Sequence, residues 1–363
     1  MIKKDRRWIW ILLGIAAIAL RYLAGFFPSL VETLYSRGVF QPIRYLLNSV
    51  ISILPFPTLY LWILVAIVLL MIFFRNLFKN HKTWKARLYQ FLLSVFALVG
   101  GVVFFFLLLW GYNYARLPFE DQLQLKPEPV SKEALLESLQ FHTKVATDFR
   151  AMVPGQSELP FGKSHIPPNF ESRIRQEIKR TMKELGYPTS GPIRARYLYK
   201  GHLLRIGTAG FYLPFTGECH VDPGLHPLQL PYVTAHEFAH GFGIGDEGTC
   251  NFIAYLTCTS SDDPFIRYSG HLSFWRSVAS SYRSYDPKWY KTFRSNLPPG
   301  MIADLNAINQ NGQLYPDIFP NLRDKTYDAF LRAQGIQEGM KNYNRVIMLE
   351  QSWRTTKQTP FLK

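Results

Sequence analysis

The sequence predicts an α-helical membrane anchor of three transmembrane helices, followed by a mostly helical α+β domain with a small sheet. Three observations support this fold class. The first third of the chain contains three long apolar runs, and the remainder alternates helical apolar spacing with short β-rich segments. A His-Glu-x-x-His motif lies in one of the helical segments. The expected organisation is a membrane domain over residues 1–112, a linker over 113–130 and a second domain over 131–363.

The three apolar runs cover about residues 8–27, 57–74 and 88–110. Each run is long enough to cross the hydrocarbon core of a bilayer as a helix. Trp and Tyr lie near the ends of the runs, where interfacial anchors are common. Arg21 interrupts the first run close to its end, so its charged group can snorkel to the interface. The lipid bilayer is therefore the first expected partner of the chain.

Lysine and arginine predict the orientation of this anchor. Four basic residues precede the first run: Lys3, Lys4, Arg6 and Arg7. Five more separate the second and third runs: Arg75, Lys79, Lys82, Lys85 and Arg87. The loop between the first and second runs carries only Arg37 and Arg44, beside Glu32. The positive-inside rule then places the N-terminus in the cytoplasm and the chain after the third run outside it. No small-residue cleavage site follows the first run, so we expect no removed signal peptide.

Charge and cysteine content exclude two other classes of protein. Residues 1–112 contain 12 Lys and Arg against 2 Asp and Glu, so they account for +10 of the net charge of +15. Because most of the excess is a topology signal and no basic-aromatic motif is present, no nucleic-acid partner is expected. Cys219, Cys250 and Cys258 are an odd number of cysteines and predict free buried thiols instead of a disulfide framework. No feature of the sequence predicts an oligomeric state.

The second domain begins with two expected helices. Ser131 is a suitable cap for a helix that runs to about Met152, and a second helix is expected over residues 170–185. The expected extended segments follow at residues 193–199, 203–206 and 210–214, the second as a strand returning after a turn. From Ser273 to the end the pattern is mostly helical, with breaks at prolines.

The motif His236-Glu237-Phe238-Ala239-His240 is the strongest functional signal of the chain. An apolar segment with Pro231 precedes it and a glycine-rich stop follows, as expected around a helix. On a helix, His236 and His240 share one face at positions i and i+4 and can bind one Zn²⁺. Glu237 can then accept a proton from a metal-bound water as a general base. We expect one Zn²⁺ per chain.

Two neighbouring carboxylates compete for the third ligand position. Asp246 lies six residues after His240, the spacing of the metzincin motif. Glu247 opens an expected apolar helix and shares a face with Asn251, which can hydrogen-bond a ligand histidine from the second shell. We favour Glu247 because only this residue has the helix partner Asn251, and Asp246 remains the alternative.

The motif, followed by Glu247 and Asn251 at the start of an apolar helix, resembles the gluzincin branch of zincin metallopeptidases. More closely, the chain resembles an uncharacterised bacterial family of three-span membrane proteins with an outer zincin-like domain. The resemblance extends to residues 252–256, 214–218 and 267–270, and loosely to the stretch from Tyr327 to Arg345. Gly248, Thr249 and Cys250 depart from the acidic pair and the alanine of that family. The resemblance implies a zinc metallopeptidase.

Several further residues are candidates with a structural alternative. His220 and His226 precede the motif helix and are either site residues or ordinary loop histidines. Tyr268 or His271 could donate a proton to the oxyanion of a tetrahedral intermediate, or could simply pack under the helix. Residues 210–216 are expected to form a sheet-edge strand that could pair with a peptide, partly blocked at Pro214.

The function expected from these features is hydrolysis of peptide bonds by a zinc enzyme of the bacterial cytoplasmic membrane, with its zinc domain and its peptide or protein substrate outside the cytoplasm. The alternative is a non-enzymatic binding or envelope-assembly module with a structural or vestigial zinc site. A fourth protein ligand such as Cys250 or His220 would indicate that alternative, because structural zinc sites are closed. No pattern in the sequence identifies the substrate.

Overall fold

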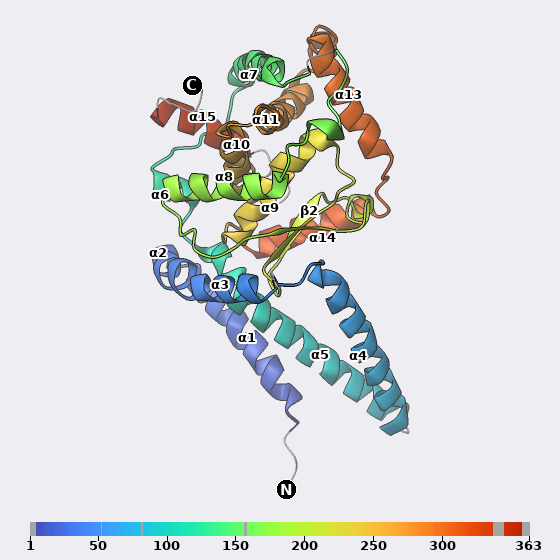
Figure 1. The fold of residues 1–363 in the computed structure, drawn as a ribbon. Coiled ribbons are helices and arrows are strands. Elements are labelled where there is room, and N and C mark those ends of the chain that lie inside the picture. Colours follow the sequence, from blue (N-terminus) through green and yellow to red (C-terminus); the bar gives the residue numbers. More distant parts are fainter. Residues whose placement is uncertain (1–4, 52, 81–82, 156–157, 337–344, 358–363) are drawn as a thin grey trace. The chain divides into compact units, whose positions relative to one another are not determined.

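The computed structural model describes residues 5–51, 53–80, 83–155, 158–336 and 345–357 (Figure 1). The chain forms two compact units, residues 1–117 with 213–218, and residues 118–212 with 219–363. Three apolar helices precede a mostly helical domain with a small sheet, so the predicted fold class is confirmed. Lys3, Lys4 and Lys82, which support the predicted orientation, and residues 337–344 of the C-terminal stretch lie outside the described residues.

The first unit is helical. Its elements are α1 (Arg7–Ala24), α2 (Pro28–Leu30), η1 (Val31–Val39), α3 (Phe40–Ile51), α4 (Thr58–Asn80), α5 (Trp84–Leu109) and η2 (Gly111–Ala115). By length and composition α1, α4 and α5 can each cross a membrane. Only 6–22% of the apolar window of each helix is buried, which leaves most of its side chains free to face lipid. The three predicted spans therefore correspond to real helices.

The segment between the first two spans is helical and not the loop that the sequence predicted. Helices α2, η1 and α3 follow one another over residues 28–51, and η1 is a π-helix. Every fourth residue is buried, and this stripe is Glu32, Ser36, Phe40, Arg44 and Asn48. Glu32 accepts hydrogen bonds from Arg37 at 2.7 Å and from both Nε and Nη2 of Arg116 at 2.9 and 2.8 Å. Because the buried stripe is mostly polar, a search for apolar periodicity does not find it.

Helices α1 and α5 lie side by side and touch through glycine (Figure 1). A Cβ atom added at Gly14 would lie 2.5 Å from the Cα of Gly100, and one added at Gly100 would lie 2.4 Å from the carbonyl oxygen of Trp10. Small residues at such a crossing let two backbones approach closely, which is how helices associate in a membrane.

Substitution of Gly100 is expected to separate these two helices. In Gly100→Ala the new methyl group meets backbone that cannot give way, so we expect a loss of about 1–3 kcal/mol of stability. The neighbouring Gly101→Ala is the control, because its Cβ would lie 3.7 Å from the nearest atom, an ordinary contact. Thermal unfolding of the detergent-purified protein measures both, and equal midpoints for the two variants would contradict this packing.

The second unit holds the remaining elements. Its helices before the sheet are α6 (Phe119–Leu123), α7 (Lys132–Met152), η3 (Lys163–His165) and α8 (Phe170–Glu184). The extended and short helical elements are β1 (Ala195–Tyr197), η4 (Leu204–Ile206), β2 (Gly210–Leu213), β3 (Glu218–Val221) and η5 (Pro227–Gln229). The later helices are α9 (Leu230–Gly241), α10 (Glu247–Thr259), α11 (Pro264–Tyr285), α12 (Pro287–Ser295), α13 (Pro299–Gln313), α14 (Pro320–Ala333) and α15 (Arg345–Lys357). The helices predicted over 131–152 and 170–185 are confirmed, and Ser131 caps α7 through the backbone N–H of Ala134.

The sheet has the order β1-β3-β2, with β1 and β3 parallel and Ala195 opposite Cys219. The predicted returning strand at 203–206 is wrong, because this segment forms the short helix η4. The buried carboxylate of Asp222 accepts hydrogen bonds from the backbone N–H groups of Gly201, Leu203 and Leu204 at 2.7–3.1 Å. These bonds fold the segment into a turn. The strand that pairs with β1 in the sheet is therefore β3.

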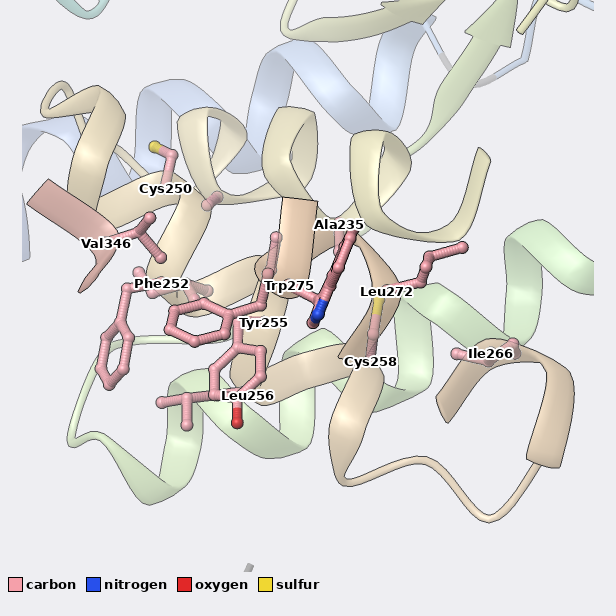
Figure 2. Close-up of a cluster of buried hydrophobic side chains, with 14 of the residues drawn as sticks. Ala235, Cys250, Phe252, Tyr255, Leu256, Cys258, Ile266, Leu272, Trp275 and Val346 are labelled. Carbon is pink, nitrogen blue, oxygen red and sulfur yellow. The ribbon is translucent and has the colours of Figure 1, made fainter. Parts of the chain in front are cut away.

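The core of the second unit surrounds α10, which packs against α8, α9, α11 and α15. Figure 2 shows Phe252, Tyr255 and Leu256 of α10 together with Trp275 of α11 and Val346 of α15. Complete burial of each such side chain contributes about 1.5–3 kcal/mol relative to exposure. The helix that begins with Glu247 is therefore held firmly on several sides, as a precise site requires.

Candidate metal centre

Helix α9 carries the motif and ends where the sequence predicted. Pro231 lies in its first turn, and Gly243 follows its last turn with a left-handed φ of 86°. The N–H of Gly243 donates to the carbonyl of His240 at 2.9 Å, and the N–H of Ile244 donates to the carbonyl of Ala239 at 3.2 Å. This is a Schellman ending, in which glycine takes the left-handed position at little cost. It turns the chain back beneath His240.

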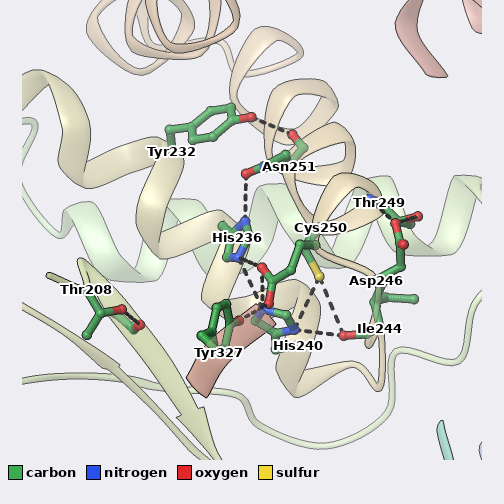
Figure 3. A network of polar contacts seen from close by, with 12 residues as sticks. Thr208, Tyr232, His236, His240, Ile244, Asp246, Thr249, Cys250, Asn251 and Tyr327 are labelled. Carbon is green, nitrogen blue, oxygen red and sulfur yellow. Dashed lines mark hydrogen bonds and ion pairs between the residues drawn. The ribbon is translucent and has the colours of Figure 1, made fainter. Parts of the chain in front are cut away.

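The chain turn and α10 fix the orientation of both histidine rings (Figure 3). Nδ1 of His240 lies 2.8 Å from the carbonyl oxygen of Ile244, and Nδ1 of His236 lies 2.9 Å from Oδ1 of Asn251. Since both partners are oxygen acceptors, each Nδ1 carries a proton, and a ring in its neutral form then has its lone pair at Nε2. The hydroxyl of Tyr232 also donates to the carbonyl of Asn251 at 2.8 Å, which steadies this partner.

Three ligand atoms converge at one point. Nε2 of His236 lies 3.1 Å from Nε2 of His240 and 3.1 Å from Oε2 of Glu247, and the third side of this triangle is 3.6 Å. Atoms bound tetrahedrally to zinc at its usual bond lengths are about 3.3–3.5 Å apart. A metal ion at the centre of this triangle would be bound by two imidazole nitrogens and one carboxylate oxygen, a set of ligands that zinc accepts. The three residues therefore fit a zinc ion.

Glu247 is the carboxylate that the structure brings to the histidines. It is buried at the first position of α10, and its other oxygen, Oε1, accepts a hydrogen bond from the hydroxyl of Tyr327 at 2.5 Å. Burial works against ionisation, but in the metal-free protein the positive charges of His240 and His236 in their protonated forms, and the hydrogen bonds that they donate, hold the pKa of Glu247 well below its usual range. The carboxylate is thus kept ionised, as a metal ligand must be.

Asp246, the alternative third ligand, serves as the N-cap of α10. Its Oδ1 accepts hydrogen bonds from the backbone N–H and the side-chain hydroxyl of Thr249, both at 2.7 Å. Among the described residues, the group that could hold a metal ion consists of His236, His240 and Glu247. The two adjacent carboxylates therefore have different roles in the structure, because helix geometry directs one to the cap and the other to the histidines.

Glu237 is buried in the turn between the two histidines. Burial raises its pKa to about 7, with Glu247 acting in the same direction and the two histidines against it. Its Oε2 has no hydrogen-bond partner among the described residues. A buried carboxylate oxygen without a partner is costly, so this atom is a natural place for water or a reacting group to bind.

Backbone of strand β2 covers this carboxylate. A Cβ atom added at Gly210 would lie 2.7 Å from Oε1 of Glu237 and 2.7 Å from the carbonyl oxygen of His220. Only glycine allows such a close approach. The order β1-β3-β2 makes β2 an edge strand, so the edge strand predicted over residues 210–216 is confirmed over Gly210–Leu213. The strand thus provides a backbone edge next to Glu237, where an extended peptide could pair.

The residues that could have closed the site with a fourth ligand lie elsewhere. The thiol of Cys250 lies 3.4 Å from Nδ1 of His240, the nitrogen that points away from the triangle. Burial raises the pKa of the Cys250 thiol to about 12. The ring of His220 stacks on Phe211 with centroids 4.8 Å apart. His226 caps η5 by accepting from the N–H of Leu228 at 3.4 Å.

Tyr268 is not brought to the metal group. It is fully buried, and its hydroxyl donates to Oδ2 of Asp304 at 2.8 Å. Asp304 also accepts from Nε of Arg150 at 2.8 Å, so these residues form a separate buried polar network. His271 is likewise buried, with its ring stacked on Phe149 at 4.4 Å. These contacts fit the structural alternative for both residues.

Two residues of the site were not recognised in the sequence. Tyr327 lies in the C-terminal stretch that carries the loose family resemblance, but no spacing rule connects it with Glu247, 80 residues earlier. Gly210 is part of the predicted edge strand, but its contact with Glu237 depends on how the strand packs over α9. The one signal for Tyr327 in the sequence was its position in the stretch that loosely resembles the family.

Loss of the Tyr327 hydroxyl is expected to weaken metal binding. Residues that hold a metal ligand from behind typically change affinity by about 10- to 100-fold when removed, so Tyr327→Phe should lower zinc affinity about 10-fold. Tyr285→Phe is the matched control, because Tyr285 is 59% exposed. Competition with a chelator measures both variants. Wild-type affinity in Tyr327→Phe would show that its contact with Glu247 has no effect on the metal.

Together these features define a protein with three apolar helices long enough to cross a membrane and a second unit that contains a buried group of two histidines and one glutamate. The chain belongs to the DUF3810 family of proteins of unknown function, whose family model matches residues 35–350. This match includes α4, α5 and the whole metal group. Neither a curated protein nor a solved structure matches the chain.

Proposed function

We propose that this protein is a membrane-anchored zinc metallopeptidase. The supporting observation is the triangle formed by Nε2 of His236, Nε2 of His240 and Oε2 of Glu247, with sides of 3.1–3.6 Å. Three protein ligands leave a tetrahedral metal with one open position, the arrangement typical of catalytic zinc. A structural site would have a fourth protein ligand, so this donor set favours an enzyme.

Glu237 moves the proton in the proposed reaction. A bound zinc ion would supply Lewis acidity, which lowers the pKa of water and polarises a peptide carbonyl. Oε2 of Glu237 accepts one proton from the attacking water, and the oxygen of that water forms the new bond to the carbonyl carbon. As the C–N bond breaks, Glu237 returns the proton to the leaving amine. One water is consumed and Glu237 ends as it began.

The proposed location is the bacterial cytoplasmic membrane, with the N-terminus in the cytoplasm and the zinc domain outside. The distribution of Lys and Arg supports this orientation. Protease added to intact spheroplasts tests it, because an outer second unit should be digested while a tag at residue 1 stays protected. The opposite pattern would reverse the orientation and place any substrate in the cytoplasm.

Peptidase activity is tested by comparing new peptide N-termini in cells that produce the wild-type chain and in cells that produce Glu237→Gln. Peptide ends that depend on the Glu237 carboxylate should appear in proteins exposed outside the cytoplasm. Glu177→Gln, a carboxylate on α8, is a control that should reproduce the wild-type ends. Identical peptide ends in all three strains would contradict a peptidase and favour a non-enzymatic zinc module.

A further inference from the structure

A pocket of about 640 Å³ lies in the second unit, and its lining includes Thr208 and Ala209, which directly precede Gly210 of β2. Its walls come from the loop that leads into β2, from Leu225 and the end of η5, from α11, and from α13 with the residues that follow it. The lining includes Thr208, Ala209, Arg276, Asn309, Gln313 and Tyr315. None of these residues has a role in the proposed reaction, so the pocket needs a separate explanation.

Arg276 on α11 is the charged group of this pocket. Neither its guanidinium nor the side-chain amides of Asn309 and Gln313 have a hydrogen-bond or ion-pair partner in the described part of the chain. The described lining contains no carboxylate, and the ionisable groups that interact electrostatically with Arg276 include Tyr290, Arg294 and His226. A half-buried guanidinium without a counter-ion is costly, and a bound anion would remove this cost.

Further positive charge lies at the border of the pocket. Lys200 and Arg205 lie over the ring of Tyr315, which lines the pocket, at 5.9 and 6.0 Å from its centroid. A concave surface with cations and amide groups attracts and orients an anion, and a planar guanidinium suits a carboxylate. The chemistry of the pocket is therefore complementary to a carboxylate group.

The pocket is continuous with the strand over Glu237. Thr208 and Ala209 line it, and the next residue, Gly210, is the one whose Cβ would lie 2.7 Å from Oε1 of Glu237. The hydroxyl of Thr208 donates to the carbonyl of Gly210 at 2.9 Å (Figure 3). Extended chain advances about 3.3 Å per residue, so a peptide beside Gly210 reaches the pocket within about one to three residues.

We infer that this pocket is a substrate subsite in which Arg276 binds a carboxylate of the peptide, an inference that rests on the proposed peptidase function. The carboxylate belongs either to an acidic side chain or to the C-terminus of the peptide. Both sources place the same group against the guanidinium, with Asn309 and Gln313 available to donate further hydrogen bonds. The substrate class is therefore a polypeptide with a carboxylate one to three residues from the cleaved bond.

Peptide binding tests this inference without cleavage. Fluorescein-labelled heptapeptides of Ala and Ser are bound to the zinc-loaded, full-length Glu237→Gln protein in nanodiscs and followed by anisotropy. One series carries a Glu or a Gln at each position in turn with an amidated end, and a second carries no Glu but has a free or an amidated end. Preference for Glu identifies an acidic side chain, and preference for the free end identifies the C-terminus.

The inference predicts that the carboxylate peptide binds about 10- to 100-fold more tightly than its neutral counterpart, the range for a hydrogen-bonded charge. Arg276→Gln should abolish this difference, while Arg283→Gln, an exposed residue on the same helix, should keep it. Equal binding of all peptides, or a preference that survives Arg276→Gln, would overturn the subsite. Arg276-dependent binding to the Glu237→Gln protein, together with no cleavage of the same peptides by the zinc-loaded wild-type protein, would instead count against the peptidase alone.

Discussion

Glu247→Gln is expected to lower the zinc affinity of the purified protein by at least about 100-fold. Loss of a residue behind a ligand already costs about 10- to 100-fold, and here the ligand itself loses its charge. His236→Ala and His240→Ala should have the same effect, because each removes one corner of the triangle. Metal analysis after gel filtration and chelator competition measure the change, with about one zinc per chain expected in the wild type.

Asp246→Ala is the decisive comparison for this prediction. It removes the N-cap of α10, which should cost about 0.5–2 kcal/mol of stability, but it leaves the three ligand atoms in place. Zinc content should therefore remain near one per chain while the thermal midpoint falls. Full zinc in Glu247→Gln together with loss of zinc in Asp246→Ala would reverse the choice of ligand.

Glu237→Gln is expected to lower peptidase turnover by about 10²- to 10⁴-fold, the usual contribution of a general base. Glutamine has the size of glutamate, so the contact with Gly210 should be preserved and zinc content should stay unchanged. The readout is cleavage of a peptide found in the comparison of cellular peptide ends, measured next to zinc content on the same sample.

Tyr268→Phe provides the contrast for this second prediction. Tyr268 is fully buried and donates to Asp304, so its loss should reduce stability by about 1–3 kcal/mol and leave turnover nearly unchanged. Retained turnover in a zinc-loaded Glu237→Gln sample would remove Glu237 from the reaction. A fall of turnover in a stable Tyr268→Phe sample would return Tyr268 to the list of reacting groups.

Local sequence rules were sufficient wherever neighbours along the chain make the site. The positions of His236 and His240 follow from helix periodicity, and Gly243 follows from the way helices end. Asn251 was predicted to bind a ligand histidine because it lies one turn after Glu247, and its Oδ1 does lie 2.9 Å from His236. Helices α1, α4 and α5 could be predicted because a helix that crosses a bilayer needs a long run of apolar residues.

The features that the sequence did not reveal depend on contacts between distant segments. The helical segment 28–51 buries polar residues, so apolar periodicity is absent from it. Residues 203–206 have the composition of a strand, but the backbone N–H groups of Leu203 and Leu204 donate hydrogen bonds to the carboxylate of Asp222. The segment therefore forms a short helix and not a strand. Tyr327 meets Glu247 only through the packing of α14, and Gly210 meets Glu237 only through the position of β2. No single-sequence rule predicts such pairs.

X-ray absorption at the zinc edge of the full-length protein tests the central claim most directly. A catalytic ion held by His236, His240 and Glu247 predicts an inner shell of nitrogen and oxygen atoms only, at about 2.0–2.2 Å, with scattering from two imidazole rings. The Glu247→Gln protein should lose this signal. A sulfur atom at about 2.3 Å would contradict the account, because it would make Cys250 or another cysteine a ligand of a closed structural site.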